Sequence, residues 1–152
     1  MASKESGGQS ALAAAVGLLS RRDHSRGELK RKLQLRGFSV EEITAAIERV
    51  IELRYQDDGR FALAFVRYRS QSGKGPRRLR AELKERQVDD ALIKAALSQE
   101  EIDWFELCRE TRLRKFGEAP PKEFKLRQKV QRYLAYRGFE MEQIRYALSD
   151  ND

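Results

Sequence analysis

The sequence is poor in the residues from which disulfides, metal sites and catalytic centres are built. Cys108 is the single cysteine among 152 residues, and His24 is the single histidine. One cysteine excludes an internal disulfide and favours a reducing compartment, so a cytoplasmic location is expected. One cysteine and one histidine do not form a grouping with zinc-ligand spacing, so no metal is expected.

Motifs for nucleotides and for nucleophilic catalysis are missing as well. Neither GxxxxGK[ST] nor GxGxxG occurs, and the Gly73–Pro76 stretch is a poor phosphate loop because proline lacks a backbone N–H. We interpret His24 as a solvated residue near a helix start, and Cys108, on an apolar stripe, as a buried structural thiol. These absences predict a protein that is not an enzyme and that binds no cofactor.

Long hydrophobic runs and alternating strand patterns are also absent. The most apolar stretch, Ala11–Leu19, is far too short to span a membrane and lacks the flanks of a signal peptide. We interpret it as a first amphipathic helix with Leu12, Val16 and Leu19 on its inner face. No long run alternates Val, Ile and Thr, so the fold class is predicted to be all-α.

The sequence does contain one pattern of five apolar positions that occurs three times. The copies begin at Leu29, Leu79 and Val130, offset by 50 and then 51 residues. The members are Leu29, Leu33, Phe38, Ile43 and Ile47; Leu79, Leu83, Val88, Ile93 and Leu97; and Val130, Leu134, Phe139, Ile144 and Leu148. A period of this size indicates tandem helical units, which present extended surfaces for binding partners.

Each copy is predicted to be a three-helix repeat in an elongated modular array. Ser25 and Ser39, each followed three residues later by Glu, form capping boxes that predict helix starts. Gly37 predicts a left-handed helix end, and Gln87 replaces this glycine in the second copy. The expected segments are a disordered tail over 1–9, followed by repeats over 10–54, 55–99 and 100–149.

The inner face of each later helix follows from the same periodicity. In the second copy, Asp57 and Asp58 are interpreted as N-cap residues of a helix that buries Phe61, Phe65 and Tyr68, and Pro76 as the first residue of the next helix. In the third copy the expected inner residues are Trp104, Leu107, Cys108, Thr111, Leu126, Val130, Tyr133 and Leu134.

Positive charge is concentrated in the second and third copies. The net charge is +7, and residues 67–86 hold eight Lys or Arg against two Glu, while residues 109–137 hold ten against three. Such clustering favours an anionic partner, either nucleic acid or an acidic protein surface. The alternative is a solvated face with intrahelical pairs, such as Arg78 with Glu82.

The basic residues form two helical stripes. Arg77, Arg80 and Lys84 follow the spacing i, i+3 and i+7 and are flanked by Lys74 and Arg78. A similar stripe in the third copy holds Lys122, Lys125, Lys129 and Arg132. Ammonium and guanidinium groups neutralise phosphates or pair with carboxylates, and exposed Tyr136 and Tyr146 are candidates for stacking.

Four stretches, taken together, resemble the RecX family of bacterial recombination regulators. They are His24-Ser25-Arg26-x-Glu28-Leu29-x3-Leu33-x3-Gly37-Phe38, Asp57-Asp58-x-Arg60-Phe61-Ala62, Gly75-Pro76-Arg77-Arg78-Leu79 and Tyr133-Leu134-x2-Arg137-Gly138-Phe139. Each stretch alone has little specificity, but their order and spacing together are strongly specific, and the resemblance covers residues 11–148. Gln87 departs from the glycine of the other copies without casting doubt on the family.

The resemblance implies a modular protein of three tandem three-helix repeats that binds the RecA recombinase, chiefly as a filament on single-stranded DNA. It implies inhibition of ATP hydrolysis, strand exchange and co-protease activity, and so a part in regulating DNA repair, homologous recombination and the SOS response. Direct DNA contact is implied as a secondary property. We expect a monomer with no metal and no membrane contact.

We hypothesise that the second copy grips the filament and that the third extends the grip. The candidate partner-binding residues are Arg60, Arg67, Lys74, Arg77, Arg78, Arg80, Lys84, Lys125, Lys129 and Arg132. One alternative is a non-sequence-specific DNA-binding protein of helix-turn-helix-like architecture, because the basic helices carry few Asn, Gln or Ser for base edges. Another is a structural adaptor for a different acidic protein.

Overall fold

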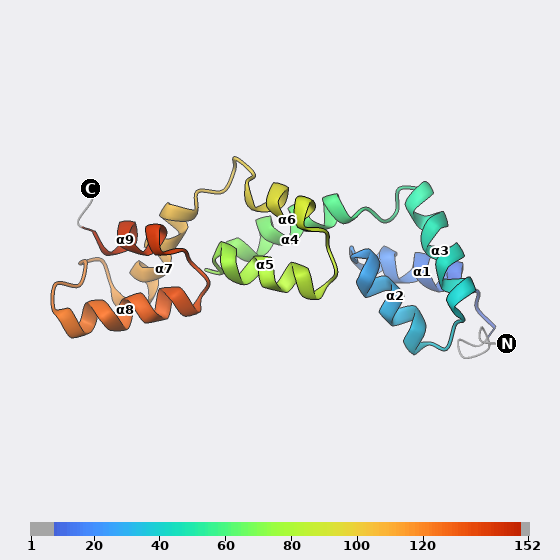
Figure 1. Ribbon diagram of the computed structural model, residues 1–152, viewed down its shortest axis with the longest axis horizontal. Coiled ribbons are helices and arrows are strands. Elements are labelled where there is room, and N and C mark those ends of the chain that lie inside the picture. Colours follow the sequence, from blue (N-terminus) through green and yellow to red (C-terminus); the bar gives the residue numbers. More distant parts are fainter. Residues whose placement is uncertain (1–7, 150–152) are drawn as a thin grey trace. The chain divides into compact units, whose positions relative to one another are not determined.

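The computed structural model describes residues 8–149 and is helical, with no strand, over that range (Figure 1). This part of the chain forms three successive groups of three helices, as the all-α prediction requires. The helices are α1 (Ala11–Arg21), α2 (Arg26–Leu35), α3 (Val40–Glu52), α4 (Asp58–Ser70), α5 (Pro76–Glu85), α6 (Asp90–Leu97), α7 (Trp104–Phe116), α8 (Phe124–Tyr136) and α9 (Met141–Leu148). The predicted tail falls largely outside the described residues.

The chain folds into two compact units that do not coincide with whole repeats. The first unit comprises the chain up to Ala62 together with Leu83–Ile93, and the second comprises Leu63–Glu82 together with the chain from Lys94 onward. The second repeat therefore contributes to both units. Its α5–α6 turn belongs to the first unit, and the start of α5 belongs to the second.

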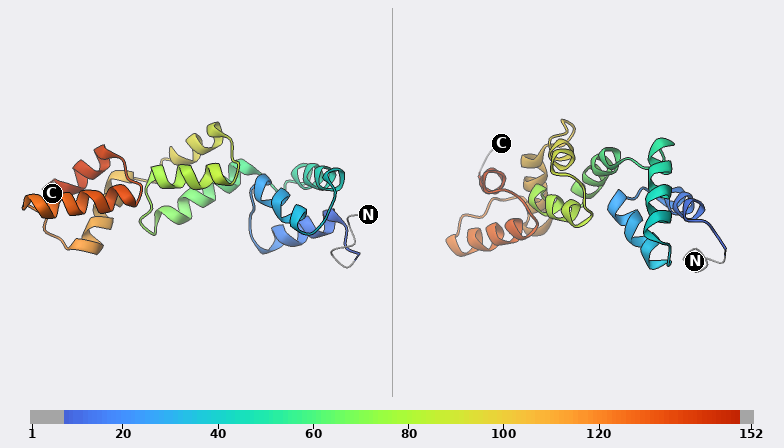
Figure 2. Two further views of the ribbon diagram at one scale, coloured as in Figure 1. Left: turned by 60° about the horizontal axis from the view of Figure 1, so that its bottom comes forward. Right: turned by 45° about the vertical axis from the view of Figure 1, so that its right-hand side comes forward.

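In the first unit, α1, α2 and α3 enclose one apolar core, and their ribbons lie together in both views of Figure 2. The core members are Ala11, Ala14, Ala15, Leu18, Leu29, Leu33, Phe38, Ile43, Ala46, Ile47 and Val50. The predicted inner face of α1 is wrong at Leu12 and Val16, which are more than one-third exposed, whereas Leu19 packs partly buried against the core. Small alanine side chains instead let α1 pack closely along α3.

The helix ends follow the local chemistry that the sequence predicted. Both capping boxes form, with the Ser25 hydroxyl accepting from the Glu28 N–H at 3.0 Å and the Ser39 hydroxyl accepting from the Glu42 N–H at 3.1 Å. Gly37 has φ +88°, so the helix ends in the expected left-handed residue. Gln87 adopts φ +62° at the equivalent turn, a conformation that costs a non-glycine residue about 1 kcal/mol.

In the second unit, α7, α8 and α9 share a core of Cys108, Val130, Leu134, Phe139, Ile144, Ala147 and Leu148. Cys108 is buried as predicted, and burial raises the pKa of its thiol to about 12. Two predicted inner residues are exposed instead: Leu126 by 41% and Tyr68 by 80%. In this unit Val66 of α4 is buried, whereas Tyr68 keeps its hydroxyl in water.

Two arginines of the basic third copy stabilise the connection between α7 and α8. The Arg112 side chain is 1% exposed and donates to the carbonyls of Gly117, Glu118 and Ala119 at 3.0–3.4 Å. Arg127 donates to the Pro121 carbonyl at 3.0 Å and to the Leu148 carbonyl at 3.2 Å. Since these guanidinium groups bind backbone oxygens, part of the third copy's positive charge stabilises the fold and is not displayed to a partner.

His24 is buried, and the prediction of a solvated histidine is wrong. The residue is 2% exposed, with Nδ1 at 3.0 Å from the Arg22 carbonyl oxygen and Nε2 at 3.2 Å from Lys32 Nζ. The Gln56 side chain also donates to the His24 carbonyl at 3.3 Å. Burial, with the nearby Arg22 and Lys32 charges, lowers the pKa of His24, so the ring is neutral at pH 7.

Stability is expected to fall in mildly acidic solution because of this ring. The folded pKa of His24 lies below the unfolded value of 6.5, so the unfolded chain binds more protons as the pH falls below 6.5. The denaturation midpoint should therefore drop between about pH 7.5 and about pH 5. The His24→Gln variant, which keeps polar atoms without a titrating ring, should show a smaller drop. Parallel pH profiles for the two proteins would contradict this prediction.

Candidate partner-binding surface

The start of α5 is fixed on the turn between α8 and α9, within the second unit. The Gly75 N–H donates to the Arg137 carbonyl at 2.8 Å, and the Arg77 N–H donates to the Gly138 carbonyl at 2.9 Å. These bonds satisfy donors that a helix N-terminus otherwise leaves open, while Pro76 between them has none to satisfy. We call this contact, formed by Gly75, Arg77, Arg137 and Gly138, the α5 joint.

Glycine makes the α5 joint possible. A Cβ atom on Gly75 would overlap the backbone of Gly138, and a Cβ atom on Gly138 would overlap Arg78. Gly138 also has φ +103°, which disfavours any other residue. The Arg137 side chain adds two bonds, donating to the carbonyls of Ser72 at 2.6 Å and Gly73 at 2.9 Å. The start of α5 is thus held in a fixed relation to α8.

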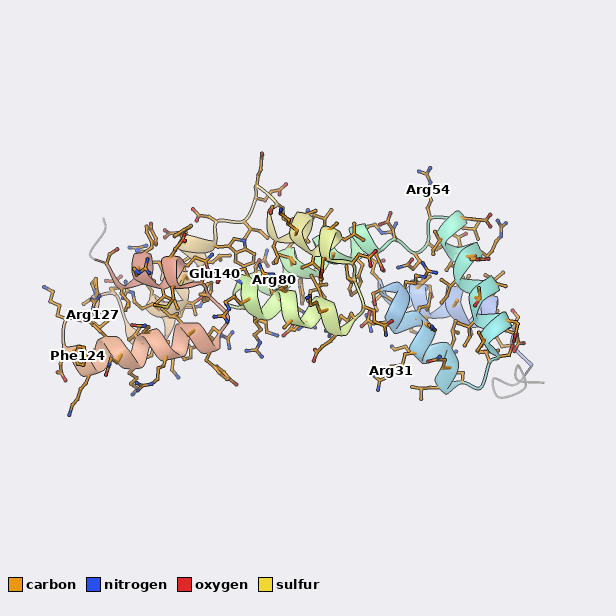
Figure 3. The ribbon with its side chains drawn as sticks, viewed as in Figure 1. Arg31, Arg54, Arg80, Phe124, Arg127 and Glu140 are labelled. Carbon is orange, nitrogen blue, oxygen red and sulfur yellow. The ribbon has the colours of Figure 1, made fainter. Side chains whose placement is uncertain are left out.

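The outer cations of α5 face one acid of the α8–α9 turn. Arg77 Nε lies 4.0 Å from one Glu140 oxygen and Arg80 Nη1 lies 3.9 Å from the other, and Figure 3 shows Arg80 and Glu140 side by side. All three side chains are between two-fifths and two-thirds exposed. Long, exposed pairs of this kind contribute little to stability, so Arg77 and Arg80 stay accessible to a partner.

Two other predicted site residues, Lys74 and Arg78, lie beside Glu82 together with Arg69, which was not predicted as a site residue. Arg69, Lys74 and Arg78 place nitrogen atoms 3.6, 3.8 and 3.3 Å from its carboxylate, and Glu82 is 18% exposed. The Arg78–Glu82 pair is the intrahelical pair expected under the solvated-face alternative. Lys74 is only 20% exposed, so its charge acts mainly inside this cluster. The predicted stripe is therefore partly a structural ion-pair network.

The structure does not gather all ten candidate residues on one unit. Arg60 and Lys84 belong to the first unit, and the other eight belong to the second. Arg60 donates to the carbonyls of Arg54 and Tyr55 at 3.0 and 2.9 Å, while Lys84 lies 3.6 Å from Asp90. Arg67 makes one long hydrogen bond, to Gln99 at 3.5 Å. Arg60 thus shapes the loop before α4.

Three exposed cations of α8 have no acidic partner in the described part of the chain. Within residues 8–149, no carboxylate lies within 4 Å of the amino or guanidinium nitrogens of Lys125, Lys129 or Arg132, and all three side chains are exposed. Their spacing of four and then three residues puts them on one face of the helix. We call these three residues the α8 cation row.

Aromatic side chains near these cations differ in how accessible they are to a binding partner. Tyr136 is 75% exposed, and the guanidinium carbon of Arg78 lies 5.9 Å from its ring centre. Phe124, at the start of α8 beside Arg127 in Figure 3, is 70% exposed. Tyr146 is held in place, because its hydroxyl donates to Glu106 at 3.1 Å and its ring meets Phe105 edge-on. Tyr136, but not Tyr146, is thus placed for stacking on a partner.

The described residues show neither a metal-binding group nor a membrane-spanning helix. Among residues 8–149, no three His, Cys, Asp or Glu side chains come together in a way that would hold a metal ion. No helix in this part of the chain is long and apolar enough to cross a membrane. The strongest chemical feature is therefore positive charge on α5 and α8.

Three family models match consecutive parts of the chain. They are described as RecX, first three-helix domain, over residues 11–49; RecX, second three-helix domain, over residues 57–97; and RecX, third three-helix domain, over residues 101–148. Together these matches cover most of the chain, and each falls on one group of three helices.

Curated proteins and solved structures are similar over nearly the same span. "Regulatory protein RecX" of Vibrio vulnificus is 44% identical over 136 residues, covering 90% of this chain and 89% of that protein. The protein of the same name from Xanthomonas axonopodis pv. citri is 47% identical over 133 residues, covering 88% and 82%. The crystal structure of RecX from Lactobacillus salivarius matches with a TM-score of 0.76 at 21% identity, covering 97% and 96%.

Proposed function

Because the chain belongs to the RecX family of regulatory proteins, we propose that it restrains the RecA recombinase by binding the RecA–single-stranded DNA filament. Its effect is to inhibit ATP hydrolysis, strand exchange and co-protease activity in the cytoplasm, and the protein acts as a monomer without catalysis of its own. The observation that carries this proposal is the α8 cation row, three exposed positive charges with no acid beside them in the described part of the chain.

Two rows of cations in the second unit suit a repetitive anionic partner. Arg77 and Arg80 on α5 are accessible, and the α5 joint fixes the start of their helix against the α8–α9 turn. A filament repeats its acidic side chains and its DNA phosphates at regular intervals. Contacts made by several cations on one rigid unit add through effective concentration, so modest individual contacts give tight binding overall.

The test is RecA ATP hydrolysis on single-stranded DNA at physiological salt while the protein is titrated in below the RecA concentration. Loss of hydrolysis at substoichiometric protein, with most of the DNA still free of it, is the expected result. Unchanged hydrolysis at stoichiometric protein would overturn the proposal. Because charge contributes strongly to binding, the protein concentration that halves hydrolysis should rise as salt is added.

A second candidate function is non-sequence-specific DNA binding. The observation that favours it is Tyr136, an exposed ring next to Arg78, since aromatic and guanidinium groups together form a platform for unpaired bases. In the same titration, hydrolysis would then fall only when the protein saturates the DNA. Binding to naked single-stranded DNA, measured in parallel, separates this function from filament regulation.

A further inference from the structure

The α5 joint has a counterpart in the first unit, where the start of α2 meets the turn between α5 and α6. The Ser25 hydroxyl donates to the Arg86 carbonyl at 2.9 Å, and Arg86 Nε lies 3.4 Å from Glu28. A Cβ atom on Gly27 would lie 2.8 Å from the Gln87 Cβ, so this approach is also close. We call this contact, formed by Ser25, Gly27, Glu28, Arg86 and Gln87, the α2 joint.

The two joints use equivalent positions of the repeat. The offsets of 50 and 51 residues align Arg36 with Arg86 and Arg137, and Gly37 with Gln87 and Gly138. In each joint, the turn between the second and third helices of one repeat receives the start of the second helix of the preceding repeat. The arginine contributes both its carbonyl oxygen, which accepts a hydrogen bond, and its guanidinium, which binds the incoming segment.

The equivalent turn of the first repeat has no such partner among residues 8–149. In that range, no donor from another segment reaches the carbonyl oxygen of Arg36 or Gly37, and the Arg36 guanidinium forms no hydrogen bond or ion pair. The two residues that flank the turn are also exposed, Leu35 by 78% and Val40 by 68%. At the corresponding positions the second repeat carries charged residues, Glu85 and Asp90.

The α2 side of this turn is basic, whereas Glu41 and Glu42 follow Val40 in the first turn of α3. Lys30 and Arg31 on α2 are exposed, and Figure 3 shows Arg31 extending away from the helix. An apolar pair bordered by cations suits a partner segment that presents both a hydrophobic side chain and a carboxylate. The α2 joint supplies a precedent, because Glu28, at the third position of its helix, pairs with Arg86.

We propose that the Leu35–Val40 turn is a docking site for the start of a helix on a RecA subunit, a helix with a carboxylate in its first turn. The inference rests on the proposed function. The helix N–H groups bind the free carbonyl oxygens of Arg36 and Gly37, as in the α5 joint, and the carboxylate binds the Arg36 guanidinium, as in the α2 joint. Acidic residues are favoured at helix starts by the helix dipole, so such a partner segment is common.

A second copy of this chain does not fit the turn in the same way. The helix to dock would be α8, the second helix of the last repeat. However, α8 begins at Phe124, six residues before Val130, whereas α2 and α5 each begin three residues before Leu29 and Leu79. The extra residues add nearly one helical turn, which occupies the space where the receiving turn lies in the α2 and α5 joints.

The test compares binding of two double variants to preformed RecA–single-stranded DNA filaments, with the protein labelled by a fluorophore. Leu35→Gln/Arg36→Glu alters the turn, and Leu12→Gln/Arg21→Glu makes the same chemical changes at exposed positions of α1 in the same repeat. We expect the turn variant to bind at least about tenfold more weakly than the wild type and the control to stay within about twofold. Denaturation midpoints should be similar for both, because none of the four side chains is buried.

The outcomes separate this inference from the proposed function. If the wild type fails to bind filaments, both the proposed function and the docking site are wrong. If the wild type binds and the turn variant binds equally well, the docking site alone is wrong. An equal loss of binding to single-stranded DNA without RecA would also overturn the inference, because it would assign the turn to DNA.

Discussion

Replacing Gly138 with alanine is expected to lower the free energy of unfolding by about 3 kcal/mol, because strain and lost hydrogen bonds add. The residue has φ +103°, and an added methyl group would overlap the Cβ and the N–H of Arg78. The α5 joint would have to open to relieve that overlap, which releases the hydrogen bonds of Gly75 and Arg77. Urea denaturation of the full chain, followed by circular dichroism, measures the change.

Substitutions of two other glycines distinguish the cost of backbone strain from the cost of steric overlap. Gly117 has φ +92°, but no atom lies within 4 Å of the place that an added methyl group would take, so Gly117→Ala should cost only the backbone strain of about 1 kcal/mol. Gly17 lies inside α1 with open space around it, so Gly17→Ala should leave stability unchanged or raise it by up to about 1 kcal/mol. If Gly138→Ala costs no more than Gly117→Ala, the close approach in the α5 joint contributes nothing.

Reversing the α8 cation row, with Lys125→Glu, Lys129→Glu and Arg132→Glu combined, is expected to remove most of the inhibition of RecA. The concentration that halves ATP hydrolysis should rise at least about tenfold at physiological salt, a change of about 1.4 kcal/mol in binding free energy. The effect should be large because no acid in the described residues pairs with these cations. Their positive electrostatic potential is therefore not reduced by a neighbouring carboxylate.

A triple variant with the same change in net charge provides the control. Arg21→Glu, Lys94→Glu and Arg145→Glu reverse three exposed cations that lie on α1, α6 and α9. This variant should shift half-inhibition by no more than about threefold, because long-range attraction alone is screened within about 8 Å. Equal losses for the two triple variants would mean that total charge, and not the α8 cation row, determines inhibition.

Features that depend on only a few residues adjacent in the sequence, such as helix ends, could be predicted from the sequence. The capping boxes at Ser25 and Ser39, the left-handed Gly37 and the proline that opens α5 each need only a few adjacent residues to be recognised. The inner face of α1 did not follow. Leu12–Val16–Leu19 and Ala14–Ala15–Leu18 are both regular helical stripes, and only the closeness of α3 selects the second.

The structural roles of Arg112 and Arg127 escaped prediction for a similar reason. Arg112 and Arg127 bind backbone carbonyls, which every residue carries, so no sequence pattern marks their acceptors. The ion pairs of the candidate surface also differ in how far apart their partners lie in the sequence. The Arg78–Glu82 pair follows from the i,i+4 spacing, whereas Glu140 reaches Arg77 and Arg80 from about 60 positions along the chain. Which cations remain unpaired is decided by such distant acids.

The two joints determine when each helix start can complete its packing during synthesis. Ser25 meets Arg86, which lies 61 residues further along, and Gly73 meets Arg137, which lies 64 residues further along. At about 5–20 residues per second, each of these helix starts waits roughly 3–13 seconds for its receiving turn to be synthesised. A nascent chain therefore carries at least one helix start without its receiving turn until the turn between α8 and α9 has been synthesised.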